Sequence, residues 1–278
     1  MRAAAVKNGM LAGQVVRKPT GRKRSASAII KDLIALTAEV VSGRQVGEKA
    51  TIRMALGVPT PIDDTKRLTA SDNLPTMGGI ALGKEITKRT GWTVKSFNDA
   101  LCFTAGEWQQ GLGKGLRFFC GVTLGTGVGL GIVADGRLVK GSHGMAGEIW
   151  NSSLGDGHVE DFVGGAGLKR LFKTRTGRSL SGEELRELAE KGDSDAIAAF
   201  AEFGGFLGQA LAWIVNCLDP EAIALGGSIA ESFAHFERSM HKAMKKYCSH
   251  KVRALVAPAQ LGEKAALIGT AMLFEAQN

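Results

Sequence analysis

The strongest constraint on the fold is an order of elements that occurs twice along the chain. Arg2 to Val6, an Asn8-Gly9 turn and Met10 to Val16 predict a β-hairpin, which strand–helix units follow. A similar hairpin with following strand–helix units begins at Phe118. The duplication predicts two similarly built α/β halves with a cleft between them. Ligands of such proteins usually bind at strand ends or between domains.

Composition narrows the class of protein. The 278 residues suffice for one large or two ordinary domains, and 44% hydrophobic and 22% charged residues are globular values. A net charge of +8 would attract anions such as nucleotides, and equally nucleic acid. Basic residues are scattered apart from Arg22 to Arg24 and the Lys242 to Lys251 region, and aromatic residues do not alternate with them. We therefore predict a solvated basic surface and no nucleic-acid partner.

Cysteine usage and hydropathy indicate the compartment. The cysteines lack CxxC spacing and lie in apolar or helical contexts, which predicts buried free thiols in a reducing compartment. They are Cys102, Cys120, Cys217 and Cys248. No apolar run is expected to span a membrane, and Met1 to Met10 lacks the apolar core of a signal peptide. We predict a cytoplasmic protein without a membrane partner.

Periodicity places the remaining elements. Helical patterns cover 28–41, 80–89, 100–110, 168–173, 181–191, 194–218, 229–247 and 265–277, and strand patterns cover 52–56, 94–97, 222–225 and 252–257. Ser181 with Glu184 forms a capping-box pattern at one helix start. The apolar stripe of 194–218 is typical of core packing.

A glycine-rich turn lies at the centre of the second hairpin. Gly125-Thr126-Gly127-Val128-Gly129 separates two apolar strands, and Asp135-Gly136 closes the next turn. Without Cβ atoms, the backbone amides could reach phosphate oxygens while Thr126 donates a further hydrogen bond. A glycine-rich hairpin without a ligand fits this segment equally well.

Carboxylates follow strands or lie in glycine-rich loops. Asp99 directly follows the strand Val94 to Phe97, where it could act as a general base or simply cap the next helix. Glu148 and Glu160 lie in glycine-rich loops and would suit the hydroxyl groups of a polyol, although each could be a solvated loop residue. Gly226-Gly227-Ser228 offers amides at a helix start, which is a weak anion-site motif.

Several of these segments together resemble the ROK family of sugar kinases and repressors, within the hexokinase–actin superfamily of two-domain ATPases. They are MRAAAVKNGMLAG, GVPTPID, SDNLP, FNDA, LGTGVGLGIVADGRLVKG, AGE, HVEDFVGG and ALGGSI. The resemblance runs from residue 1 to the final helix. It implies an α/β fold of two ribonuclease H-like, actin-like ATPase domains with a central cleft. The implied division is 1–100 plus 262–278 for the small domain and 101–261 for the large one.

The resemblance also implies a set of site residues. Asp99 becomes the catalytic base. The substrate-binding residues would be Asn73, Asn98, Glu148, Asn151 and Glu160. The nucleotide- and phosphate-binding residues would be Gly125, Thr126, Gly127, Gly129, Gly226 and Gly227. ATP with its Mg²⁺, a hexose and a homodimeric assembly are the implied cofactors and partners.

The sequence departs from the family in two places. Many members build a zinc site from a histidine three residues after the AGE glutamate and a cysteine-rich stretch, but here Asn151 takes that position and Ser152 to Gly157 contains no cysteine. We therefore predict no zinc. The family's opening strand, which ends in Asp-x-Gly-Gly-Thr, is missing from the first domain. Either the chain as given starts late or it is an impaired relative, and we favour the late start.

The leading hypothesis is ATP-dependent phosphorylation of a glucose-like hexose. A catalytically impaired sugar-binding or sensor protein of the same family is the alternative. A ROK-type regulator is a further alternative, but those proteins place a helix-turn-helix before the kinase-like body, and we find no such segment in this sequence. The sequence does not identify the sugar.

Overall fold

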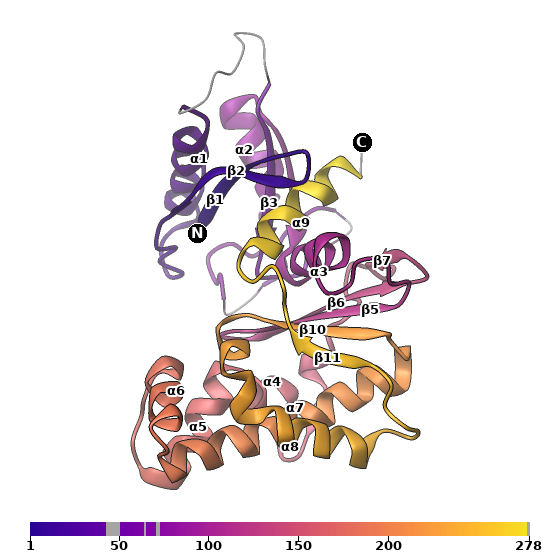
Figure 1. Cartoon of the computed structure of the whole chain (residues 1–278). Helices are drawn as coiled ribbons and strands as arrows, with labels where there is room; N and C mark the ends of the chain where they lie inside the picture. The colour runs from indigo at the N-terminus through magenta and orange to yellow at the C-terminus, as the bar shows by residue number, and fades with distance from the viewer. Residues whose placement is uncertain (43–50, 64, 71–72, 277–278) are drawn as a thin grey trace.

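The computed structural model describes residues 1–42, 51–63, 65–70 and 73–276, in which strands and helices alternate (Figure 1). In chain order the elements are β1 (Arg2–Lys7), β2 (Met10–Arg17), α1 (Ala26–Ser42), β3 (Arg53–Val58), α2 (Leu82–Thr90), β4 (Thr93–Asn98), α3 (Asp99–Gln110), β5 (Phe119–Leu124), β6 (Val128–Ala134), β7 (Arg137–Val139), η1 (Ile149–Asn151), β8 (Ser153–Leu154), β9 (Gly157–His158), α4 (Val159–Phe162), α5 (Gly165–Thr176), α6 (Gly182–Glu190), α7 (Ser194–Leu218), β10 (Ala222–Gly226), η2 (Ser228–Ser232), α8 (Phe233–Tyr247), β11 (Leu255–Pro258) and α9 (Lys264–Glu275).

Two strand pairs form the first half of the molecule. β1 and β2 make an antiparallel hairpin, closed by Asn8 and Gly9 with φ of 52° and 74°. β3 and β4 pair in parallel, and α3 begins directly where β4 ends. α1 packs on the hairpin and α2 on β4, whereas α9 contacts all four strands (Figure 1). This order places the end of β4, and therefore Asp99, at the boundary with the second half.

A five-stranded sheet forms the second half, in the order β11-β10-β5-β6-β7. β5, β10 and β11 run parallel, whereas β6 and β7 are antiparallel to their neighbours. α3 packs closely against one face of the sheet. Glycine at positions 121 and 131 permits this approach, because a Cβ at either position would overlap the side chain of Thr104. The carboxyl ends of β5 and β10 therefore meet near the start of α3, which is where the glycine turns lie.

Helices cover the other face of this sheet. α7 packs along α8 and against α5, with Phe200, Phe203 and Leu207 fully buried (Figure 1). The apolar stripe predicted for 194–218 is therefore core, as expected. α7 is also long and apolar enough to cross a bilayer by length and composition, contrary to our expectation for the sequence. Its most apolar window is 56% buried inside the molecule, which is the environment of a core helix.

Most predicted elements are confirmed within a few residues, including the Ser181–Glu184 capping box. The helix predicted over 229–247 is wrong at its start, because a 3₁₀ turn precedes α8 after Gly227, whose φ is 87°. The strand predicted from Val252 begins only at Leu255. The short elements β8, β9 and α4 were not predicted, since segments of two to four residues carry too little periodicity.

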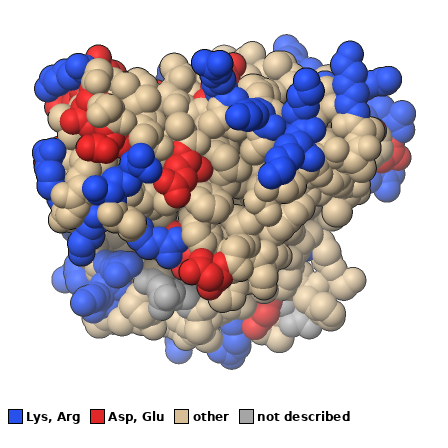
Figure 2. Space-filling view, turned by 90° about the horizontal axis from the view of Figure 1, so that it is seen from below, with Lys and Arg blue, Asp and Glu red and all other residues tan. Residues whose placement is uncertain are grey.

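The cysteines and the surface charge refine the expectations drawn from composition. Cys102 and Cys120 are buried as predicted, but Cys217 is exposed and Cys248 half-buried. Burial raises the pKa of the Cys102 and Cys120 thiols to about 12. Figure 2 shows Lys and Arg side chains in separate groups on one face, with Asp, Glu and uncharged surface between them. This distribution agrees with a solvated basic surface on that face.

Candidate active site

One cavity of about 1910 Å³ lies between the two halves, where the carboxyl ends of β3, β4, β5 and β10 meet. Every site residue that the sequence predicts lines this cavity. They are Asn73, Asn98, Asp99, Gly125, Thr126, Gly127, Gly129, Glu148, Asn151, Glu160, Gly226 and Gly227. Ser71 and Asp72 of the SDNLP motif lie outside the described residues. The structure therefore brings together groups separated by more than a hundred residues of sequence.

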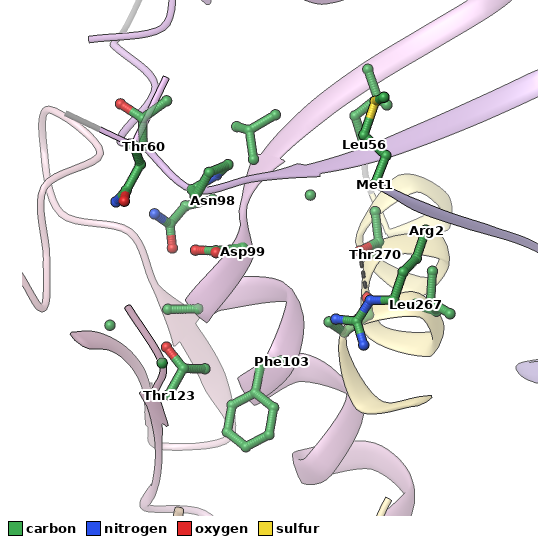
Figure 3. Close-up of a pocket in the computed structure, with 18 of the residues that line it drawn as sticks. Met1, Arg2, Leu56, Thr60, Asn98, Asp99, Phe103, Thr123, Leu267 and Thr270 are labelled. Carbon is green, nitrogen blue, oxygen red and sulfur yellow. Dashed lines mark hydrogen bonds between the residues drawn. The ribbon is translucent and has the colours of Figure 1, made fainter. Parts of the chain in front are cut away.

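Asn98 and Asp99 share the boundary between β4 and α3. The Asn98 side-chain oxygen caps α3 by accepting a hydrogen bond from the Leu101 amide at 3.1 Å. Asp99 is thus the first helical residue and not the cap of α3. Figure 3 shows its carboxylate facing the open cavity, between the Asn98 amide and the Thr123 hydroxyl.

Burial changes the acidity of the Asp99 carboxyl group. Desolvation raises its pKa from 3.8 to about 6, and the Ala100 amide offsets part of this rise. The carboxylate is therefore ionised at neutral pH but binds a proton more readily than an exposed aspartate. A general base needs this combination.

Glu148 and Glu160 approach the same part of the cavity. The pKa of Glu148 is raised, first by burial and then by the charges of Asp99 and Glu160. Glu160, in α4, accepts a hydrogen bond from the Val128 amide through Oε1 at 3.2 Å. Like charges this close are stabilised by a ligand that donates hydrogen bonds to them. A polyol is such a ligand.

The glycine turn after β5 lines the same cavity. The Gly125 amide donates to the Gly127 carbonyl at 2.9 Å, and the Gly165 amide donates to the Gly125 carbonyl at 2.8 Å. A Cβ at Gly127 would overlap Oε1 of Glu160, whereas a Cβ at Gly125 would meet only the Gly127 carbonyl at 4.0 Å. The turn thus presents open space at Gly125, next to the amino end of α5, where anions are stabilised.

Gly226 and Gly227 form the second glycine turn on the cavity. A Cβ at Gly226 would overlap the Phe103 ring, and one at Gly227 would overlap the Leu124 carbonyl. Packing therefore already requires glycine at both positions. Their backbone groups still line the cavity, so a nucleotide-binding role remains compatible with the geometry.

The positions at which relatives are expected to bind zinc carry other residues in this chain. Asn151 is exposed at the end of η1, and the residues after it form the β8–β9 hairpin. Trp150 and Leu154 are buried in the core of the second half. Among the described residues, no group of three or more His, Cys, Asp or Glu could hold a metal ion. The absence of zinc stays a prediction.

Two further cavity residues were missed in the sequence. Thr123 lies in β5 at the edge of the cavity, where a Cβ at Gly129 would come within 2.8 Å of its Oγ1 (Figure 3). Its place near the carboxyl end of a central strand was a usable signal. Arg170 adds a positive charge, held by the Asp161 carbonyl at 2.8 Å and the Phe162 ring at 4.6 Å. No local pattern distinguishes Arg170 from other basic helix residues.

Comparison with known proteins agrees with this geometry. The model of the ROK family matches residues 3–277. An N-acetyl-D-glucosamine kinase of Aliivibrio salmonicida is 27% identical over 269 residues, covering 89% of this chain and 87% of the relative. A glucokinase of Halalkalibacterium halodurans is 26% identical over 298 residues, covering 96% of this chain and 90% of the relative.

A solved structure gives the same picture for the fold. A ROK family glucokinase from Streptomyces griseus, in complex with glucose and AMPPNP, superposes with a TM-score of 0.84 at 25% identity. The match covers 98% of this chain and 95% of that chain. The actin-like ATPase fold that the motifs imply is thereby confirmed.

Proposed function

The chain belongs to the ROK family, and on that premise we propose that it phosphorylates a hexose of the glucose type with ATP, using Asp99 as the general base. Relatives named as kinases of glucose and of N-acetyl-D-glucosamine support the substrate class. The convergence of Asp99, Glu148, Glu160 and the Gly125 turn on one cavity carries the proposal.

Each group has a defined part in the proposed reaction. Glu148 and Glu160 bind sugar hydroxyls and orient the ring, with Asn73, Asn98 and Asn151 as further partners. Asp99 accepts the proton of the attacking hydroxyl as that oxygen bonds to the γ-phosphorus. The amides at Gly125 to Gly129 and at Gly226 and Gly227 hold the phosphates and the nucleotide. Mg²⁺, which we expect to arrive bound to ATP, would supply positive charge at the phosphates.

A coupled assay of ADP release across glucose, N-acetylglucosamine and mannose tests the proposal. We expect turnover with at least one sugar, and a loss of about 100- to 10,000-fold in kcat for Asp99→Asn, the range of general base catalysis. Sugar binding, followed by calorimetry, should persist in this variant. Asp156→Asn, on the β8–β9 turn and outside the cavity, is the matched control. Full turnover by Asp99→Asn would remove Asp99 from this role.

A sugar-binding protein without catalysis is the competing proposal. It predicts saturable sugar binding by calorimetry with no ADP release for any hexose. Detectable ADP release that depends on the sugar and on Asp99 would exclude it.

A further inference from the structure

Positive charge is concentrated in one stretch of the chain. Residues 238–255 contain six of the 35 Lys and Arg residues and none of the 27 Asp and Glu residues. The stretch therefore has a net charge of +6 in a chain whose net charge is +8. It covers most of α8, the loop that follows and the start of β11. We call it the basic stretch, and its cations are Arg238, Lys242, Lys245, Lys246, Lys251 and Arg253.

The six cations of the basic stretch are exposed to solvent. None of them forms an ion pair with any residue that the structure describes. Two bordering carboxylates, Glu237 and Asp219, lie instead 4.0 Å and 3.7 Å from the imidazoles of His241 and His250. Figure 2 views the layer of α7 and α8 from below, and Lys and Arg side chains project from its right-hand part. Such a surface has a positive potential that attracts polyanions.

Hydrogen bonds fix the backbone of the basic stretch at both ends of its loop. At the end of α7, the Asn216 side chain donates to the Tyr247 carbonyl at 3.1 Å and accepts from the Ser249 amide at 3.0 Å. Where the loop ends, the Leu255 amide donates to the Glu221 carbonyl at 3.0 Å. α8 itself packs along α7. The cations therefore project from an ordered surface and keep their positions relative to one another.

Exposed apolar side chains accompany the cations. Six large apolar side chains of the described residues are exposed, and three of them, Phe118, Tyr247 and Leu255, lie here, with exposed fractions of 37%, 41% and 55%. Phe118 lies beside Leu255, because its amide donates to the Glu221 carboxylate at 3.0 Å. Cations mixed with aromatic and aliphatic side chains are typical of surfaces that bind membranes. A nucleic acid would match the cations, but its phosphates offer no apolar phase for Leu255.

The basic stretch and the cavity lie at opposite ends of the second sheet. Phe118, Glu221 and Leu255 lie at the amino ends of β5, β10 and β11, which run parallel. The cavity is lined by Gly125 and Gly226, at the carboxyl ends of β5 and β10. Strands of this length separate the two ends by about 17–20 Å. A surface that docks on the basic stretch would therefore leave the cavity open.

We propose that the basic stretch binds the surface of an anionic lipid bilayer, with Tyr247 and Leu255 entering the headgroup region. Each basic residue near such a surface strengthens binding about fivefold. This binding needs no spanning helix, whereas the sequence-based expectation of no membrane partner considered spanning segments only. The proposal does not depend on Asp99 or on the phosphorylation of a hexose.

Sedimentation of the full chain with lipid vesicles tests the proposal. We expect binding to phosphatidylcholine vesicles that contain about one third phosphatidylglycerol, and none to phosphatidylcholine alone. The affinity should fall at least about tenfold between roughly 0.05 M and 0.5 M salt, because salt screens exposed charges. Replacing three lysines of α8 together by glutamine should weaken binding about 100-fold, whereas the same charge change on α1 and α2 should leave it within about twofold. The first variant carries Lys242→Gln, Lys245→Gln and Lys246→Gln, and the control carries Lys31→Gln, Lys84→Gln and Lys88→Gln, all at exposed positions.

A pair of apolar variants distinguishes a lipid surface from other polyanions. Leu255→Ala should weaken vesicle binding about fivefold, whereas Ile197→Ala, at a residue 42% exposed on α7, should leave it unchanged. Equal binding to vesicles with and without phosphatidylglycerol, or no binding to either, would overturn the proposal. Equal losses in the two lysine variants would also overturn it. Tighter binding to a single-stranded oligonucleotide, with no effect of Leu255→Ala on vesicle binding, would assign the surface to nucleic acid instead.

Discussion

Asp99 shows how one residue meets conflicting demands. Burial makes its carboxylate a stronger base, but the same burial makes the ionised form unfavourable in the folded protein. Its pKa is raised from 3.8 to about 6. Between pH 4 and pH 6 the folded protein therefore binds a proton at Asp99 more tightly than the unfolded chain does. The charged form therefore lowers stability above pH 6, and this penalty disappears as the pH falls below about 4.

Asp99→Asn should consequently stabilise the fold in a pH-dependent way. We expect the free energy of unfolding to rise by about 1–2 kcal/mol at pH 8, after allowing for partial exposure, and to stay unchanged at pH 4. Urea denaturation at both pH values measures the difference. Equal stabilisation at pH 4 and pH 8 would show that the effect comes from packing and not from the charge.

The sequence could predict which side chains line this cavity, but not how each one is held there. Asp99 could equally have been a helix cap, because the two readings differ only in whether the helix begins at residue 99 or 100. The Asn98 cap shows that the helix begins at residue 99, and a one-residue boundary lies below the precision of pattern analysis. Arg170 was missed because its position on the cavity depends on the Phe162 ring beneath it.

At the scale of elements, a buried carboxylate joins α3 to the approach of α9. Glu107 is fully buried, and its Oε2 accepts from the Leu112 amide at 3.0 Å and the Gln260 amide at 3.1 Å. Its Oε1 accepts from the Leu261 amide at 2.7 Å. These bonds fix the segment that links β11 to α9, and thereby the position of α9 beside β3.

Glu107→Gln should therefore destabilise the protein despite its similar shape. The amide nitrogen would replace an oxygen that faces backbone donors, which leaves at least one buried N–H unpaired. We expect a loss of about 3 kcal/mol in the free energy of unfolding, measured by urea denaturation. Glu187→Gln, on the exposed face of α6, should change it by less than about 0.5 kcal/mol. Equal losses in the two variants would contradict this account.

The glycine turn after β5 gives a second prediction for an element. Gly127→Ala would place a Cβ against Oε1 of Glu160 and displace that carboxylate from the Val128 amide. We expect KM for the sugar to rise about tenfold, since a displaced contact of this kind costs roughly 1–2 kcal/mol. Steady-state kinetics measure the change.

Gly205→Ala is the matched control for this glycine. Gly205 lies within α7, and a Cβ there would meet no atom within 4 Å. The variant should leave KM unchanged and stabilise the fold by about 0.5–1 kcal/mol, because alanine is the better helix former. A rise in KM equal to that of Gly127→Ala would show that the effect is not local to the turn.

Short sequence motifs predicted the turns at which the backbone requires particular residues. Asn8-Gly9 and Asp135-Gly136 marked tight turns because their residues adopt positive φ, and all four do so. The start of α8 was misplaced because the 3₁₀ turn before it has the composition of a helix. Such breaks depend on the tertiary packing of Gly227 against Leu124, which lies a hundred residues away.

For the whole molecule, the sequence predicted two α/β halves with a cleft between them. It could not predict the distances between the side chains that line this cleft. The pattern of hairpin and strand–helix units showed the duplication, and the family resemblance supplied the pairing of distant motifs. Only the structure places Asp99 close enough to raise the pKa of Glu148.

A hexose that bridges the two halves should protect both of them from hydrogen exchange at once. Asn98 and Asp99 belong to the first half, whereas Gly125 to Gly129 and Glu148 belong to the second, and all line one cavity. A bound sugar that draws these walls together should slow exchange on both sides with the same dependence on sugar concentration, since one binding event closes the cleft. Exchange measured by mass spectrometry against glucose and N-acetylglucosamine tests this directly. Protection of one side alone would mean that the sugar binds within one half, and the cavity would then not be a shared active site.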